Sequence, residues 1–415
     1  MKLPKKCMKQ VKSFLVYLLL FGAVLRLAVA YLTVHHFDLS FYYDWATGAV
    51  SDFFRAYETI PNLDYPPLFL FPLYLTGHLL QLDAVRAYPP LEMVVLKGWQ
   101  ILGDLVVVLL LYFILRKRPF AAAGAAALWA VNPAAIVNSA YWGQTDSIMI
   151  AFLLASFWML EEGRAEVSGI LLALGCLMKF QTLYFVPLFV LGLFCRFSYQ
   201  QILRTILAAA AVGIGIFFPF LLYSGWDLPF RIYFGGFQSY PGAVLNGFNL
   251  YGALGLNFTH VDSPFAGYLT IDMFSYFMLS LILVATVYLY LTATEKSFWL
   301  LGFLLIQSVF LFTARMHERY EIPALAFGFA ACVYHKSRPL AAGVAGLTLM
   351  VFLNQFLVLD KAFHPQLEPY FQVILQALSW GNLLLYGLTA MASVHILYRR
   401  GRLSFPFSFR RFALR

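Results

Sequence analysis

The sequence has few charged residues for its length. Only 12% of its 415 residues are Asp, Glu, Lys or Arg, whereas a soluble globular chain carries about 25%. Hydrophobic residues make up 61% of the chain, and apolar runs recur from end to end. The low charge excludes a water-soluble enzyme, and the runs predict an all-α polytopic membrane protein. We expect a single integral membrane domain over residues 1–415.

Cysteine and nucleotide-binding motifs are also scarce. The four cysteines show no metal-site spacing and do not suggest a disulfide framework. The glycines at 213–215 and 235–236 do not form a phosphate-binding loop. The motifs therefore predict neither a resident metal nor a nucleotide cofactor.

The basic residues orient about twelve predicted membrane segments. The net charge of +9 could indicate nucleic acid, but these residues sit at the ends of apolar runs, where they orient helices. With both termini on the cytoplasmic side, 20 of the 29 Lys and Arg residues lie inside. The first apolar run continues for about twenty residues, so a retained helix is favoured over a cleaved signal peptide. The segments are residues 13–32, 93–115, 119–137, 146–160, 167–178, 181–195, 203–223, 268–292, 297–313, 321–335, 339–358 and 371–397.

Two segments depart from this pattern. Residues 66–82 are short and contain Pro72, so we expect a helix in or dipping into the outer leaflet, within a first extracytoplasmic loop over 33–92. Residues 167–195 are long for one crossing and carry Lys179 at their middle. A hairpin of two short helices would bring Lys179 to the outer side; one long tilted helix is the alternative. A second large outer loop is expected over residues 224–267.

Polar motifs gather on the predicted outer side. The run from Arg315 to Glu321 has five ionisable residues in seven positions between apolar segments. Charges at this density beside a membrane are costly and mark functional candidates. The other motifs lie at residues 41–45, 64–68, 132–133, 142–146 and 179–181.

Four basic side chains form a candidate phosphate site. Arg315, His317 and Arg319 can present several donors to one anion, and arginine matches phosphate oxygens in pairs. Lys179 would add a point charge. The alternative is an internal salt network in which Glu318 and Glu321 neutralise the arginines.

Three aspartates have competing interpretations. Asp44 lies among aromatic residues and suits a general base for a sugar hydroxyl, but a helix-capping or loop carboxylate is about as plausible. Asp146 could contact substrate or stabilise a helix N-terminus. Asp104 lies inside an apolar run, so we expect a structural partner for it. Arg26, near the outer end of the first helix, is expected to snorkel toward water.

The chain resembles a known superfamily through several of these motifs together. They are Trp142-Gly143-Gln144-Thr145-Asp146 after Asn132-Pro133, Tyr65-Pro66-Pro67-Leu68, Lys179-Phe180-Gln181 followed by Pro187, and Arg315-Met316-His317-Glu318-Arg319-Tyr320. In these runs it resembles bacterial proteins related to the eukaryotic GPI-anchor mannosyltransferases, within the GT-C superfamily of polytopic glycosyltransferases. The resemblance covers about residues 25–334.

The resemblance implies a polyprenyl-phosphate-linked hexose donor, with mannose the leading sugar, and transfer on the extracytoplasmic face. The acceptor would be a glycan, lipid or polymer of the cell envelope. An acidic residue of the first outer loop would be the base; Asp44 is assigned here, with Asp38, Asp52 or Asp146 as a second carboxylate. The expected substrate contacts are Tyr65, Trp142, Gln144, Asp146, Gln181 and Glu318.

The expected reaction is a single inverting displacement, in which fixed cations meet the leaving phosphate. Such a leaving group has little need of a metal, and none is predicted. The rival class is a transporter or flippase of lipid-linked saccharides, which would need polar residues reached from both sides and often has inverted repeats. No internal repeat is visible in this sequence.

Overall fold

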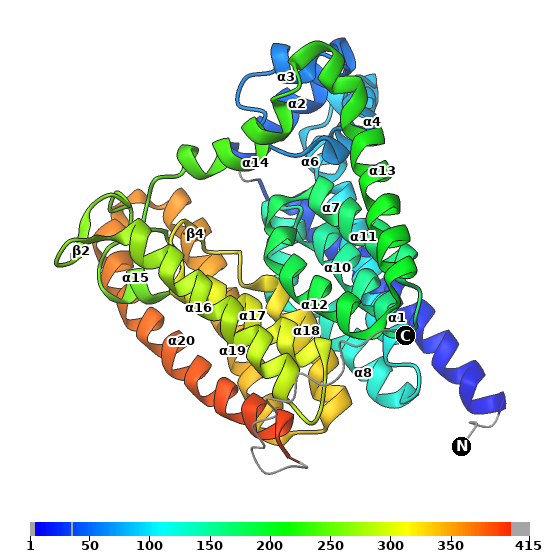
Figure 1. The fold of residues 1–415 in the computed structure, drawn as a ribbon. Helices are drawn as coiled ribbons and strands as arrows, with labels where there is room; N and C mark the ends of the chain where they lie inside the picture. The colour runs from blue at the N-terminus through cyan, green and yellow to red at the C-terminus, as the bar shows by residue number, and fades with distance from the viewer. Residues whose placement is uncertain (1–4, 35, 400–415) are drawn as a thin grey trace.

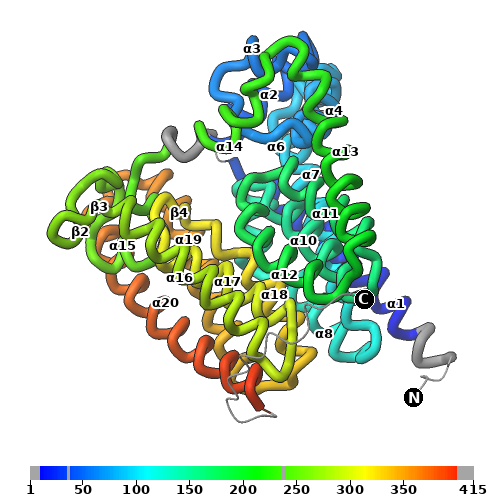
Figure 2. The backbone as a smooth tube through the Cα atoms, viewed as in Figure 1, coloured from blue at the N-terminus to red at the C-terminus, as the bar shows by residue number. Residues whose placement is uncertain are grey.

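The computed structural model describes residues 5–34 and 36–399, and almost all of its regular structure is helical. In the view of Figure 1, α1 begins and α20 ends at the lower end, while α2 to α6 lie at the upper end. Figures 1 and 2 show one group of helices from α1 to α13 and a second from α15 to α20, with α14 crossing between them. The first group comprises α1 (Lys5–Leu32), α2 (His36–Ser51), α3 (Ala56–Thr59), η1 (Pro67–Phe69), α4 (Leu70–Leu80), α5 (Asp83–Arg86), α6 (Pro89–Leu96), α7 (Gly98–Ile114), α8 (Pro119–Ala130), α9 (Pro133–Ile136), η2 (Val137–Trp142), α10 (Asp146–Glu161), α11 (Ala165–Met178), η3 (Phe180–Phe185), α12 (Val186–Arg196) and α13 (Tyr199–Ser224).

The second group follows α14 (Leu228–Ser239). It comprises β1 (Val244–Leu245), α15 (Leu250–Ala253), β2 (Pro264–Ala266), β3 (Leu269–Thr270), α16 (Ile271–Thr292), α17 (Phe298–Phe312), β4 (Met316–His317), α18 (Ile322–His335), α19 (Arg338–Phe363), η4 (Pro365–Leu367) and α20 (Glu368–Leu397). The strands are short: β1 pairs with β4 in parallel, and β2 pairs with β3 in an antiparallel hairpin. The β1–β4 pair links the predicted second outer loop, residues 224–267, to the run from Arg315 to Glu321.

Every predicted membrane segment falls on a helix or a pair of helices. Among the described residues, five helices are long and apolar enough to cross a membrane, or up to seven if each bent pair is one span. One pair bends by 47° between α6 and α7, and the other by 44° between α8 and the stretch Pro133–Trp142. These helices support a polytopic membrane protein, whereas twelve separate crossings remain a prediction.

Local sequence signals explain several helix starts. Proline occupies one of the first two positions of α6, α8 and α9, where its missing N–H breaks no intrahelical bond. Ser198 and Gln201 form a capping box at the start of α13. The segment η2 is a π-helix that ends at Trp142. Such turns are rare and often lie at functional sites.

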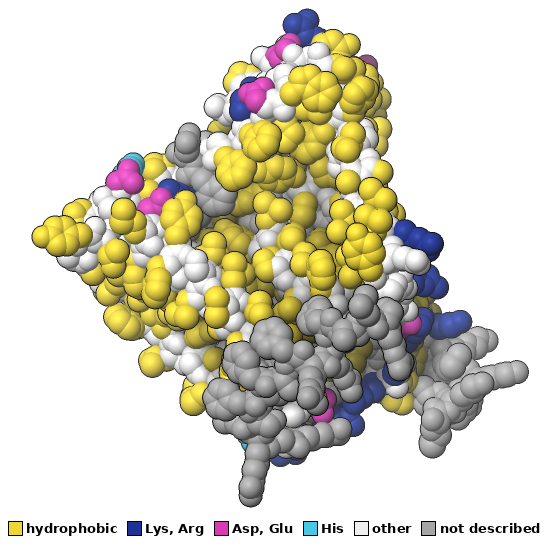
Figure 3. Space-filling model, in the orientation of Figure 1, with side chains coloured by type: hydrophobic (Ala, Val, Ile, Leu, Met, Phe, Trp, Pro, Cys, Tyr) yellow, Lys and Arg dark blue, Asp and Glu magenta, His cyan; other side chains and the backbone are white. Residues whose placement is uncertain are grey.

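The surface has an apolar middle and charged ends. Figure 3 shows hydrophobic side chains over most of the central surface, with Lys and Arg gathered mainly at the lower right and lower end. This is the distribution expected of a protein surrounded by lipid.

The predicted hairpin is also present, because α11 ends at Met178 and α12 follows η3 after Lys179.

The predicted first outer loop, residues 33–92, packs against the helix bundle. Leu39 and Trp45 of α2, Phe69 of η1 and Phe220 of α13 share one buried cluster. The segments around Asp38 and Asp64 are thereby held against the ends of α11 and α13.

A buried ion pair joins α1 to α7. Arg26 Nε lies 2.8 Å from Asp104 Oδ2, and both side chains are at most 1% exposed. Arg26 also donates to the carbonyl of Ala130, and Trp129 Nε1 donates to Asp104. The expectation of a structural partner for Asp104 is confirmed. The expectation that Arg26 snorkels is wrong, because a carboxylate and a carbonyl satisfy its guanidinium inside the helix bundle.

Replacing Asp104 alone with leucine should leave the Arg26 charge buried and unpaired, which costs about 3–5 kcal/mol of stability. The double variant Arg26→Leu, Asp104→Leu should recover much of this loss, because the remaining buried groups are apolar. Thermal unfolding of both variants in detergent measures the difference. Equal destabilisation of the single and double variants would contradict a net role for the charge pair.

Candidate functional site

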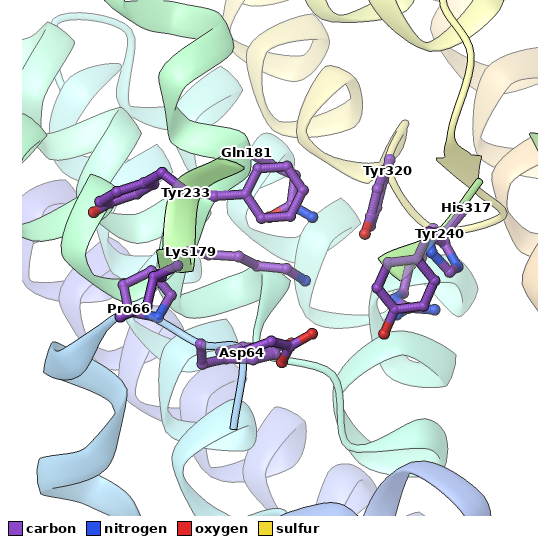
Figure 4. A pocket seen from close by; sticks show the side chains of 12 residues that line it. Asp64, Pro66, Lys179, Gln181, Tyr233, Tyr240, His317 and Tyr320 are labelled. Atoms are coloured by element: carbon purple, nitrogen blue, oxygen red, sulfur yellow. The ribbon is translucent and has the colours of Figure 1, made fainter. Parts of the chain in front are cut away.

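Four distant chain segments enclose a pocket. Its lining includes Asp64 from the first loop, Lys179 from the hairpin tip, Tyr233 of α14, and Arg319 from the turn before α18. Figure 4 shows Lys179 and Asp64 reaching into the same space, with Tyr240, His317 and Tyr320 along another wall. The remaining lining residues are Tyr65, Pro66, Phe180, Gln181 and Ile232.

The pocket is narrow in this conformation. Its volume is about 50 Å³, below the about 300–1,000 Å³ typical of ligand sites. Tyr240 is 40% exposed and follows α14 in the loop that leads to β1. A ligand as large as a sugar phosphate therefore requires movement of the walls, and Tyr240 is the most exposed aromatic residue of the lining.

Lys179 is fixed by a buried carboxylate. Lys179 Nζ lies 2.7 Å from Asp146 Oδ1, and their side chains are 4% and 1% exposed. Asn138 donates to the other oxygen of Asp146 at 3.1 Å. Lys179 also lies over the ring of Tyr320, 5.8 Å from its centroid. The Asp146 side chain thus serves to position a cation.

Arg319 is the second cation of the pocket. Its Nη1 donates to Glu318 Oε1 at 2.5 Å, and its guanidinium lies 5.4 Å from the ring centroid of Trp142. Among the described residues, its buried Nε has no hydrogen-bond partner, and the same holds for Oε1 of Gln181. Buried polar groups are nearly always paired, so these two atoms indicate a place for a ligand or water.

The structure separates Arg315 from the other predicted phosphate ligands. Arg315 forms an ion pair with Asp272 at the start of α16 and does not line the pocket. Its backbone is left-handed, with a φ of +62°. The prediction that Arg315 joins Lys179 and Arg319 is not met in this pocket, because the chain turns at Arg315 and the carboxylate of Asp272 on α16 binds its side chain.

His317 lies between two tyrosine rings. Its ring centroid is 5.1 Å from that of Tyr240 and 5.0 Å from that of Tyr320. Burial, together with the positive charges of Arg319 and Lys179, lowers the pKa of His317 well below its ordinary value. His317 is therefore neutral near pH 7, and it offers a hydrogen bond instead of the positive charge that we expected.

The turn before α10 orients a carboxylate of the first loop. Trp142 Nε1 and Gln144 Nε2 both donate to Oδ2 of Asp38, at 2.5 and 2.7 Å. Gly143 between them has a φ of +83°, which favours glycine. A Cβ atom at Gly143 would lie 2.8 Å from Leu39 Cδ2, so the turn also needs glycine for its close approach to α2.

Asp44 does not lie with these groups. It is exposed on α2 and does not line the pocket. The start of the same helix is in contrast packed against the protein: Leu39, the residue after Asp38, is 2% exposed. Because a helix repeats every 3.6 residues, Asp38 and Asp44, six positions apart, face different directions.

Asp64 is the carboxyl group that sequence reasoning missed. It lines the pocket, and burial raises its pKa to about 6. The sequence feature that could have pointed to Asp64 is its position beside the Tyr65-Pro66-Pro67 motif. An aspartate in a loop carries no pattern that distinguishes it from Asp44.

The expected substrate contacts fall into two layers. Tyr65 and Gln181 line the pocket with Lys179, His317 and Arg319. Trp142, Gln144, Asp146 and Glu318 hold other polar side chains through hydrogen bonds or ion pairs. The salt-network alternative holds for one pair: Glu318 pairs with Arg319, whereas Arg315 pairs with Asp272 and Glu321 accepts a hydrogen bond from Asn382.

Comparison with known proteins gives one family match. Residues 63–248, somewhat less than half of the chain, match the model of glycosyltransferase family 87, a GT-C-type family of membrane glycosyltransferases. No curated protein matches the chain. The match confirms the resemblance to GT-C membrane glycosyltransferases and supports a glycosyltransferase activity.

Replacing Gly143 with alanine should destabilise the turn that holds Asp38. The left-handed backbone costs a non-glycine residue about 1–2 kcal/mol, and the new Cβ would press on Leu39. The matched control is Gly124→Ala in α8, where a Cβ would meet nothing within 4 Å. Thermal unfolding in detergent should separate the two variants; equal midpoints would show that the turn tolerates a side chain.

Proposed function

We propose that this GT-C-type membrane glycosyltransferase moves a hexose, with mannose the leading sugar, from a polyprenyl-phosphate donor to an acceptor of the cell envelope. The pocket shared by Lys179, Arg319 and Asp64 carries the proposal. Its two cations, one with an unpaired Nε, suit a phosphate, and its tyrosine rings suit the face of a sugar. The family match favours transfer over the alternative of a lipid-linked saccharide transporter.

The proposed orientation places the pocket on the extracytoplasmic face. It rests on the basic residues, most of which fall on the side of the termini. Lys179, Asp64 and Arg319 come from segments that are all predicted to lie outside, and they line one pocket. Because the three residues share one pocket, their segments lie on the same side of the membrane in this proposal. The distribution of basic residues favours the extracytoplasmic side.

The catalytic base in this proposal is Asp38, which, like Asp44, does not itself line the pocket, but whose charge acts on Arg319 and Tyr240 of its lining. The Trp-Gly-Gln-Thr-Asp turn has two functions: Trp142 and Gln144 orient Asp38, and Asp146 orients Lys179. Both donors bind the same carboxylate oxygen, so Oδ1 of Asp38 faces no donor of this turn. The first-loop carboxylate implied by the resemblance is therefore reassigned from the exposed Asp44 to Asp38.

The proposed reaction is one displacement at the anomeric carbon. The acceptor hydroxyl oxygen attacks that carbon while its proton passes to Oδ1 of Asp38. The bond from the anomeric carbon to the phosphate oxygen breaks, and its electron pair stays on the phosphate. Lys179 and Arg319 meet the charge that develops there. Attack opposite the leaving group inverts the anomeric configuration.

Asp64 has a separate part in the proposal. Its carboxylate lines the pocket together with Tyr240. An ionised carboxylate accepts hydrogen bonds from sugar hydroxyls, so Asp64 would recognise the hexose. This function requires the charged form.

Asp38→Asn should bind donor and lose transfer by about 10²–10⁴-fold, the usual cost of removing a general base. Asparagine keeps an oxygen for the bonds from Trp142 and Gln144 but cannot take the proton. Asp44→Asn, an exposed site on the same helix, is the matched control and should stay near the wild-type rate. The measurement is transfer of radiolabelled mannose from polyprenyl-phosphate mannose in purified membranes. A large loss in Asp44→Asn with an active Asp38→Asn would return the base to Asp44.

The pH profile should report on Asp64. With a pKa of about 6, Asp64 is ionised above that pH and becomes neutral below it. The kcat/KM for donor should therefore fall as the pH drops through about 6. Asp64→Asn is neutral at every pH, so it should have a lower kcat/KM at pH 7 and a weaker acid limb. An unchanged acid limb in Asp64→Asn would assign that ionisation to another group.

A further inference from the structure

Two consecutive polar residues of α19, Asn354 and Gln355, are buried inside the protein. Their exposed fractions are 2% and 0%, and α19 is one of the helices that are long and apolar enough to cross a membrane. A polar side chain in such a helix is costly unless it is hydrogen-bonded. Both residues lie outside residues 63–248, the stretch that matches the family model. Their hydrogen-bond partners show what they contribute to the molecule.

Gln355 joins α19 to the wall of the pocket that carries Lys179. Its Oε1 accepts a hydrogen bond of 3.0 Å from Asn138 Nδ2 on η2. The same Nδ2 donates to Asp146 Oδ2 at 3.1 Å, and Lys179 Nζ lies 2.7 Å from Asp146 Oδ1. A chain of three polar contacts therefore runs from a helix of the second group to the first cation of the pocket.

The amides in this chain have a defined direction. Gln355 Nε2 donates to the carbonyl of Val351 at 3.2 Å and to that of Ala134 at 3.4 Å, which turns its Oε1 toward Asn138. The two hydrogens of Asn138 Nδ2 are then taken up by Gln355 and Asp146. A flipped Asn138 would place its own oxygen against the oxygens of both partners. Gln355 therefore fixes the orientation in which Asn138 supports Asp146.

Asn354 joins the same turn of α19 to the wall that carries His317 and Arg319. Its Oδ1 accepts from the backbone N–H of Phe248 at 2.9 Å, and its Nδ2 donates to the carbonyl of Asn246 at 2.6 Å. Asn246 is bridged in turn to His317, beside the β1–β4 pair. His317 and Arg319 both line the pocket. Adjacent residues of one helix thus hold two walls of the same pocket.

An apolar cluster packs around this junction. Trp142 at the end of η2, Phe248, Val358 of α19 and Leu375 of α20 are buried in it together. Water is thereby kept from the surroundings of the buried amides, and hydrogen bonds in such a dry region are stronger than in water.

We infer that Asn354 and Gln355 are positioning residues that set the separation of Lys179 and Arg319 for a bound phosphate. The inference rests on the proposed function, because that function assigns the phosphate to these two cations. Neither Asn354 nor Gln355 lines the pocket, so each acts through other residues. The separation matters because a displacement of about 1 Å at a reacting centre can cost about 10²-fold in rate.

The kinetic test removes the hydrogen bonds of Gln355 at nearly constant side-chain length. In Gln355→Met, kcat/KM for polyprenyl-phosphate mannose should fall by about 5- to 100-fold, because the support of Asp146 is lost. The matched control is Gln307→Met. Gln307 is also 0% exposed and lies in the second group, where its Oε1 accepts from Thr389. The control should lose thermal stability to a similar extent and keep kcat/KM near the wild-type value.

A double variant tests whether Gln355 acts through Asn138. Asn138→Ala alone should lower kcat/KM at least as much as Gln355→Met, and the two together should cost less than about twofold more, because they break one chain. Losses that multiply would overturn the inference. A Gln355→Met variant with wild-type kcat/KM would do the same, as would an equal loss in Gln307→Met.

A distance measurement separates the inference from the proposed reaction. Nitroxide labels at Leu183 in η3 and Leu254 after α15, which are 41% and 45% exposed, report on the two walls once the native cysteines are replaced. The distance distribution, measured by pulsed EPR in lipid nanodiscs, should shift or broaden in Gln355→Met and Asn354→Ala but not in Gln307→Met. Such a change without hexose transfer by the wild type would refute the proposed function and leave the positioning of the walls standing. An unchanged distribution would refute the positioning role, even where transfer is lost.

Discussion

The buried pair of Lys179 and Asp146 is the interaction on which the site depends. It joins the tip of the α11–α12 hairpin to the first residue of α10, so two helix ends that are 33 residues apart in the sequence are fixed together. A buried charge without its partner is strongly destabilising. Neither residue can therefore move far without the other. The same turn that supplies Asp146 also supplies the donors to Asp38, so the position of the cation and that of the proposed base are coupled.

The cations of the pocket are largely offset by neighbouring carboxylates. Arg319 is paired with Glu318, Lys179 with Asp146, and His317 is neutral near pH 7. Selectivity for a phosphate would then come from a few oriented donors inside a partly dry space, where fixed dipoles act more strongly than in water.

The sequence predicted the helices well and the site only in outline. Apolar runs and charge bias locate helices because every span in lipid must satisfy its backbone hydrogen bonds internally, which favours long apolar helices. The same reasoning brought Lys179, His317 and Arg319 to one end, and they share a pocket. It misplaced Arg315 and Arg26, because their partners, Asp272 and Asp104, are 43 and 78 residues away. It favoured Asp44 over Asp38 because local composition does not show which face of a helix a distant turn will touch.

The π-helical segment η2 gives the site a constraint of length as well as of residue type. A π-helix fits one more residue into each turn than an α-helix, and η2 ends at Trp142, just before Gly143 and Gln144. One residue of an α-helix corresponds to a rotation of about 100°. Loss of a single residue anywhere in η2 would relax it to an α-helix and turn the indole of Trp142 away from Asp38, even with every motif residue intact. The number of residues between Asn132-Pro133 and the Trp-Gly-Gln turn is thus as important to the site as the motifs themselves. In related chains with the same two motifs, we expect this number to vary less than the residues between them.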